Sequence, residues 1–191
     1  WDVITNSFSY AQERSSQLGL QLLTSLATNA VIGDEKIDWI TSHIDRVFVS
    51  YDGVSYVQDA HRPLVSGKGS SQSVAHTLHK FDAAELDYAI RLTVTSDQVG
   101  LLPDSLEFIC KNFHPQRIQA EPTFQIGRGI DAPSVETEAF ISAFREARYR
   151  AKLYGFDFNF APVRLDNLSN LVCGITQDSF GLSADGNVTT C

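Results

Sequence analysis

Segments with strand periodicity alternate with segments of helical periodicity along almost the whole chain, and this pattern limits the possible folds more than any other property of the sequence. Helical patterns cover 5–17, 34–44, 70–81, 103–112 and 134–154, and strand patterns cover 20–28, 46–51, 88–95 and 117–123. Alternation of this kind is typical of α/β proteins, in which helical crossovers join parallel strands. We therefore predict an α/β fold whose four strands are parallel neighbours in sequence order, with the helices on the outer side.

Local residue types indicate where several of these elements begin. Ser70 or Ser71 is expected to cap the helix that follows the only long loop, 54–69, and Ser134 is expected to cap the last helix. Pro103 suits the first turn of its helix. The last helix carries an apolar stripe that predicts its buried face, formed by Phe140, Phe144, Ala147, Ala151 and Tyr154.

Composition and charge narrow the range of functions. With 191 residues, 43% of them hydrophobic and 20% charged, the chain fits one globular core of ordinary size. The formal net charge is -8 and Lys and Arg do not cluster, so a nucleic-acid partner is not expected. The sequence has neither an apolar run long enough for a membrane helix nor a signal peptide. Together with three cysteines, this predicts a cytoplasmic protein in a reducing compartment.

Four smaller features have a structural interpretation beside a functional one. The run 67–71 offers backbone amides to an anion, but it lacks P-loop spacing, and a flexible loop ending in a cap is favoured. His76 and His79 share one helix face, which is favoured to be solvated and not metal-binding. Cys110 is expected to be a small buried residue. Arg91 lies inside an apolar strand and needs an anionic partner, so a structural ion pair and a ligand contact stay equally open.

Two cysteines near the end of the sequence, Cys173 and Cys191, flank a predicted β-hairpin. An Asp185–Gly186 pair stands between two short strand patterns, which is a strong hairpin signal. Such a hairpin would bring both thiols near one metal. No C-x-x-C unit accompanies them, so on spacing alone a chance placement is an equally open interpretation.

The pattern around these two cysteines resembles the opening of the SPASM extension, the auxiliary-cluster domain of many radical SAM enzymes. The strands that precede it resemble barrel strands of the same family, in the same order, so the resemblance covers nearly the whole chain. Its most specific pieces are the cysteine hairpin and the Ser-x-Asp-Gly ending of segment 47–53, which is similar to the family's fourth strand.

The other segments match the family less closely. Segment 20–29 resembles the third strand, which usually closes in Thr-Asn-Gly, although Ala30 stands here in place of the glycine. Segment 59–62 is similar to the family's His-Asp-x-x-Arg segment in altered order, and segments 90–95 and 117–123 resemble the fifth and sixth strands. Because the first two strands have no counterpart, the resemblance implies a partial (β/α) barrel of the TIM type, an open arc of parallel strands.

The resemblance also implies a chemistry. In radical SAM enzymes a C-x-x-x-C-x-x-C motif holds a 4Fe-4S cluster, which cleaves S-adenosylmethionine reductively to a 5′-deoxyadenosyl radical that takes hydrogen from the substrate. That motif and the Gly-Gly-Glu segment after the second strand are absent here and are expected upstream. The chain also contains no methionine, so we expect either an internal piece of a longer protein or a sequence from which positions were dropped.

The expected function is therefore that of a central fragment of a radical SAM oxidoreductase or maturase, similar to sulfatase-maturating enzymes, that modifies a peptide or protein. The fragment alone is expected to hold no intact iron–sulfur cluster and to be inactive. The alternative is a non-catalytic binding or scaffold module on a degenerate barrel. Residues 1–155 are expected to form the partial barrel, and 156–191, entered by an alternating strand pattern over 156–160, to begin the SPASM-like region.

The resemblance places the S-adenosylmethionine site at the carboxyl ends of the strands. The candidate residues there are Thr28, Asn29, Ser50, Asp52, Arg91 and Glu121. Among them, Ser50 and Arg91 are the first candidates for contacts with the cofactor, and Asp52 is expected to order its own turn beside Gly53. Cys173 and Cys191 are the candidate metal ligands.

Overall fold

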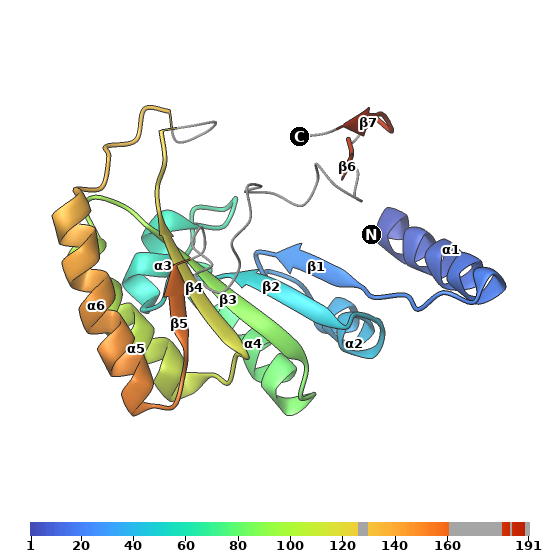
Figure 1. Cartoon of the computed structure of the whole chain (residues 1–191), viewed down its shortest axis with the longest axis horizontal. Coiled ribbons are helices and arrows are strands. Elements are labelled where there is room, and N and C mark those ends of the chain that lie inside the picture. The colour runs from blue at the N-terminus through green and yellow to red at the C-terminus, as the bar shows by residue number, and fades with distance from the viewer. Residues whose placement is uncertain (126–129, 161–180, 184, 190–191) are drawn as a thin grey trace. The chain divides into compact units, whose positions relative to one another are not determined.

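The computed structural model describes residues 1–125, 130–160, 181–183 and 185–189. It divides into two compact units, Trp1–Asn159 and Phe160–Cys191. The first unit contains one five-stranded sheet in the order β1-β2-β3-β4-β5 (Figure 1). The strands are β1 (Ser25–Thr28), β2 (Arg46–Ser50), β3 (Asp87–Val94), β4 (Arg117–Pro122) and β5 (Phe158–Phe160).

The sheet confirms the predicted α/β class, because its five strands are parallel and follow the order of the sequence. β1 begins later than expected, at Ser25, because its partner β2 begins only at Arg46, which is the residue opposite Ser25. Residues 20–24 therefore have no strand beside them. The end of the strand pattern over 156–160 forms β5, which joins the main sheet, and the first compact unit ends at Asn159.

Helices follow the strands as predicted, with two additions, a short helix and a 3-10 turn. They are α1 (Asp2–Leu18), α2 (Asp34–His43), α3 (Ser55–His61), α4 (Ser71–Ala83), the 3-10 turn η1 (Val99–Leu101), α5 (Leu102–Asn112) and α6 (Thr137–Leu153). The prediction that 54–69 is one long loop is wrong, since α3 occupies its first half. α3 is only two turns long and buries Val57 and Gln58, which is too few apolar positions for a helical period to appear in the sequence.

One face of the sheet is covered by helices and forms the core. Side chains alternate across a strand, and in β3 Tyr88, Ile90, Leu92 and Val94 are buried on this face while Arg91 on the opposite face is exposed. Ala89, also on the opposite face, is small and is buried as well. The buried side chains of β2, β3 and β4 pack with those of α2, α4, α5 and α6, among them Ile37, Ile40, Val47, Val49, Leu78, Phe81, Leu106, Ile109, Ile118 and Ala147. On the other face, which carries Arg46, Ser50 and Arg91, none of the described helices of the first unit packs, and the polar side chains are accessible within this unit.

Helix α1 lies beside the core and contributes little to it. None of its residues is buried, and its contacts are aromatic: the rings of Trp1 and Phe8 meet the ring of Trp39 on α2 edge to face, with centroids 5.5 and 5.4 Å apart. Among the described residues no helix is long and apolar enough to cross a membrane.

The helix caps differ from the expectation at two places. The carboxylate of Asp59, on α3, accepts hydrogen bonds from the backbone N–H and the hydroxyl of Ser71, at 2.7 and 3.0 Å, and so caps α4, while Ser70 makes no capping bond. Ser134 does not cap α6. Glu136 does, by accepting from the N–H groups of residues 138 and 139, where a negative charge also suits the helix dipole.

The predicted inner face of α6 is correct except at its end. Ala147 and Ala151 are buried, and Phe140 and Phe144 pack partly buried against the core. Tyr154 is 40% exposed, because it follows the last helical turn and directs its hydroxyl to Glu107 at 3.0 Å.

The second unit contains the predicted hairpin. β6 (Gly181–Leu182) and β7 (Val188–Thr189) pair antiparallel, and Gly186 in the turn has φ 83°, a conformation that suits glycine. Cys173 and Cys191 lie outside the described residues.

Candidate functional site

Polar side chains from three neighbouring strands meet on the uncovered face of the sheet, near the carboxyl ends. The parallel register sets Ser50 of β2 beside Arg91 of β3. The guanidinium of Arg91 forms an ion pair with the carboxylate of Glu121 on β4, with 3.0 Å between Nη2 and Oε1. Both side chains stay accessible, at 46% and 31% exposure. Arg91 therefore has a structural partner and a free donor surface at the same time.

The first strand ends in a turn at the same edge. Thr28 accepts a hydrogen bond from the N–H of Ala30 through its hydroxyl at 3.0 Å, and Asn29 accepts one from Val31 through its side-chain oxygen at 3.1 Å. Ala30 has φ 58°, the left-handed conformation that favours glycine, and it is fully buried. Ala30 therefore holds a conformation that a glycine would adopt without strain. The side-chain oxygens of Thr28 and Asn29 therefore accept hydrogen bonds from backbone N–H groups of their own turn.

Asp52 occupies the centre of a second polar group at this edge. It is 2% exposed, and its carboxylate accepts from Arg62 Nε at 2.7 Å and from the N–H of Thr93 at 2.9 Å. It also pairs with His61 Nδ1 at 3.3 Å. The expectation that Asp52 orders its own turn is therefore wrong, because its hydrogen bonds join α3 to β3.

The same group extends to the loop after β3. His61 Nε2 lies 3.0 Å from the hydroxyl of Thr95, and Arg62 donates to the hydroxyl of Thr93 at 3.1 Å. Burial by itself would raise the pKa of Asp52, but the hydrogen bonds from His61 and Arg62, the charge of Arg62 and the N–H of Thr93 outweigh it, and the net shift is downward. Asp52 is therefore a stable anion at neutral pH.

Two residues of this edge were not singled out from the sequence. Gln58 is 1% exposed, and its side-chain oxygen accepts from the N–H of Asp52 at 2.9 Å while its amide donates to Ser70 at 2.9 Å. Thr93 is the other. Its spacing of two residues from Arg91 places both on one strand face, so strand alternation was the signal that could have identified it.

The described residues contain no set of iron–sulfur ligands. Within them no three His, Cys, Asp or Glu side chains gather as metal ligands do. Cys110 is buried as predicted, and burial raises the pKa of its thiol to about 11, so it is a poor source of thiolate. The candidate ligands Cys173 and Cys191 fall outside the described part of the chain.

Comparison with known proteins identifies the fold. No family model and no curated protein matches the chain. Among solved structures, the chain is similar to native anSMEcpe with bound AdoMet, a SPASM/radical SAM sulfatase-maturating enzyme, with a TM-score of 0.77 and 18% identity over 100% of this chain and 56% of that one. The chain has the fold of a partial radical SAM barrel.

Two further structures support this. Streptococcus suis SuiB bound to S-adenosylmethionine matches with a TM-score of 0.62 and 11% identity, over 93% of this chain and 44% of that one. A domain of pyruvate-formate lyase-activating enzyme from Bacteroides vulgatus ATCC 8482 matches with a TM-score of 0.56 and 15% identity, over 77% of this chain and 84% of that one. The resemblance found in the sequence is thus confirmed for the fold, and the chain spans about half the length of the radical SAM structures anSMEcpe and SuiB.

Proposed function

We propose that this chain supplies the S-adenosylmethionine-binding face of a radical SAM enzyme that modifies a peptide or protein. Two observations support the proposal together. The fold is that of a radical SAM barrel, and neighbours with this fold have S-adenosylmethionine bound, one of them together with the Kp18Cys peptide. The uncovered face of the sheet also presents an accessible arginine at the end where barrel enzymes place their ligands.

Arg91 is the residue that carries this proposal. S-adenosylmethionine has an α-carboxylate, and a guanidinium matches a carboxylate with parallel hydrogen bonds. Glu121 takes one side of the guanidinium and fixes its orientation, so that the remaining N–H groups stay available. Ser50 stands beside Arg91 in the register and offers a hydroxyl to the same carboxylate. The donor set therefore fits the amino-acid end of the cofactor.

The remaining polar residues hold the backbone around the proposed site in place. Asp52 holds α3 against β3 through Arg62 and Thr93, and this fixes the backbone that follows Ser50. Thr28 and Asn29 stabilise the turn after β1 at the same edge. When bound beside a reduced iron–sulfur cluster, S-adenosylmethionine supplies a carbon radical that removes hydrogen from a substrate. The described residues contain no set of ligands for that cluster, so we propose that its ligands lie outside them, in the parent protein.

β5 pairs into the main sheet, so we propose that the barrel part extends through it and that the SPASM-like region begins after residue 160. The β6–β7 hairpin then belongs to that region, with Cys173 and Cys191 as its candidate ligands.

The test is the affinity of the full-length parent protein for S-adenosylmethionine. Arg91→Gln is expected to raise the dissociation constant at least about tenfold, because a hydrogen bond to a charged group contributes about 1.5–3 kcal/mol. Ser50→Ala is expected to have a smaller effect of the same sign. Arg148→Gln is the control, since Arg148 is exposed on α6 and has no ion pair within the described residues. Unchanged affinity in both site variants would remove Arg91 and Ser50 from the site.

A second measurement separates an enzyme from a non-catalytic binding module. The parent protein with its cluster reduced should release 5′-deoxyadenosine from S-adenosylmethionine. Binding without this product would favour the alternative of a binding or scaffold module on the same barrel.

A further inference from the structure

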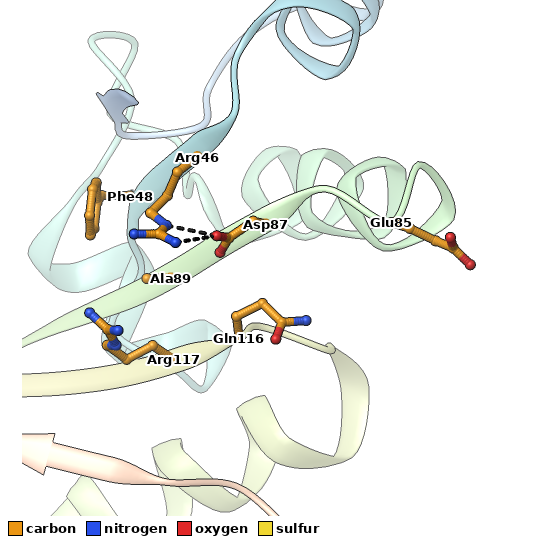
Figure 2. A pocket seen from close by; sticks show the side chains of 7 residues that line it. All are labelled: Arg46, Phe48, Glu85, Asp87, Ala89, Gln116 and Arg117. Atoms are coloured by element: carbon orange, nitrogen blue, oxygen red, sulfur yellow. Dashed lines mark hydrogen bonds and ion pairs between the residues drawn. The ribbon is translucent and has the colours of Figure 1, made fainter. Parts of the chain in front are cut away.

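A hollow lies on the uncovered face of the sheet, at the amino ends of the strands. Its volume is about 460 Å³, within the range of small-molecule sites. Figure 2 shows its lining, formed by Arg46, Phe48, Glu85, Asp87, Ala89, Gln116 and Arg117. Arg46, Asp87 and Arg117 are the first residues of β2, β3 and β4. The hollow is therefore at the end of the sheet opposite to Ser50 and Arg91.

The register explains why the sheet is hollow here. Ala89 on the middle strand lies between Phe48 on one side and Arg117 on the other. The two neighbours carry large side chains, whereas Ala89 carries a methyl group, so the surface drops between them. Phe48 and Ser50 are two residues apart on β2 and share a face, which separates the hollow from the Ser50 level by roughly 7 Å.

The two arginines of the hollow differ in whether a carboxylate pairs with them. Arg46 is neutralised by Asp87, whose Oδ2 accepts from Nε at 2.7 Å and lies 2.6 Å from Nη2. Arg117 has no ion pair and no side-chain hydrogen bond within the described part of the chain, and it is exposed. Glu85, the other acidic residue of the lining, extends away from Arg117 in Figure 2. The hollow thus offers one unneutralised guanidinium next to an aromatic ring and a small apolar floor.

We propose that this hollow is a binding site for a small monocarboxylate with an apolar or aromatic body. The carboxylate pairs with the guanidinium of Arg117, and the body rests on Phe48 and Ala89. A dianion such as phosphate fits less well, because the carboxylate of Asp87 lies in the same hollow and repels a second negative charge. The proposal does not depend on the S-adenosylmethionine face, since none of its lining residues belongs to that site.

Benzoate is a suitable probe, because it combines one carboxylate with a flat apolar ring. Titration of the 191-residue chain, followed by NMR chemical shifts or calorimetry, is expected to give a dissociation constant on the order of 1 mM, as a ligand of this size allows. Benzamide, which has nearly the same shape without the charge, is expected to bind at least about tenfold more weakly.

Two variants test the two halves of the site. Arg117→Gln removes the charge and should weaken benzoate binding at least about tenfold, whereas Arg148→Gln, which removes one exposed guanidinium from α6, should leave it unchanged. Ala89→Leu fills the floor and should abolish binding, with circular dichroism to confirm folding. The proposal is overturned if no binding is detected at a benzoate concentration about tenfold above the expected dissociation constant. It is also overturned if the Arg117→Gln variant binds benzoate as tightly as the unaltered chain does. The Arg117→Gln measurement tests the proposal even if the Ala89→Leu variant does not fold.

Discussion

At the scale of single residues, Asp52 is the group on which the polar contacts at the carboxyl edge converge. It is a buried anion with an arginine, a histidine and a backbone N–H around it. A buried charge is tolerated only when it is paired and hydrogen-bonded, and all of its partners come from other elements. This one carboxylate therefore joins β2, α3 and β3, and its ionisation is coupled to folding.

The pH dependence of stability follows from this coupling. The pKa of Asp52 is lowered from its ordinary value of 3.8 in the folded chain, so its contribution is fully present above that value and is lost as the pH falls through the lowered pKa. Asp52→Asn is expected to cost about 2–4 kcal/mol at pH 7 and to flatten the loss of stability below about pH 4. Urea unfolding between pH 7 and pH 2 measures both effects.

A matched control is Asp38→Asn, because Asp38 is exposed on α2 and its side chain has no hydrogen bond or ion pair within the described residues. That variant should keep both the stability and the acid profile of the unaltered chain. If Asp52→Asn has an equally steep acid limb, the titration of Asp52 is not what links stability to pH.

At the scale of elements, the connection from β2 to α3 depends on a close approach to α5. Gly53 follows Asp52, has φ 101°, and faces the first turn of α5 so closely that a Cβ atom would overlap Ser105 and lie 2.7 Å from its Cα. Two requirements meet at this glycine, a left-handed backbone and the absence of a side chain. The Ser-x-Asp-Gly ending is therefore a packing motif as well as a strand end.

Gly53→Ala is expected to destabilise the chain by about 3 kcal/mol or more, since overpacking against backbone adds to the cost of the positive φ. Gly67→Ala isolates the cost of the positive φ. Gly67 also has a positive φ, 80°, but nothing lies within 4 Å of its added Cβ. It should lose only about 1 kcal/mol. Equal losses in thermal or urea unfolding would show that the approach to Ser105 is not what requires glycine at position 53.

At the scale of the whole molecule, the described helices of the first unit pack on one face of its sheet, and none of them packs on the other face. The packed face explains stability, and the free face carries both proposed sites, at opposite ends of the same strands. The described residues contain no set of ligands for an iron–sulfur cluster, and Cys110 lies in the core. The chain is therefore expected to depend on other parts of the parent protein for the cluster.

Anaerobic reconstitution with iron and sulfide tests this dependence. In radical SAM enzymes the three cysteines of a C-x-x-x-C-x-x-C motif hold the 4Fe-4S cluster. The 191-residue chain contains three cysteines but not this motif, and Cys110 is buried, so less than one cluster per chain is expected. Cys110→Ala should leave any bound iron unchanged, because burial raises the pKa of that thiol to about 11. A stoichiometric cluster spectrum together with 5′-deoxyadenosine from the chain alone would contradict the expectation.

The order of the elements and the parallel sheet could be predicted from the residues alone, because strand and helix periodicity are local properties of the sequence. The sequence also identified Arg91 as a charge inside an apolar strand and Gly53 as part of a strand end. It failed at α3, where one short helix buries a glutamine that is recognisable only through its partners, Asp52 and Ser70. Helix caps that come from a distant part of the chain were missed for the same reason. An example is Asp59 of α3, which caps α4.

Which polar groups contact one another could be seen only in the three-dimensional structure. Ser50 and Arg91 become neighbours through the β2–β3 register, and Arg91 and Glu121 through an ion pair between two strands. The hollow above Ala89 exists because two larger side chains from other strands stand on either side of it. Contacts of this kind join residues that are distant in the chain, and the sequence pattern around each residue carries no information about its partner's position.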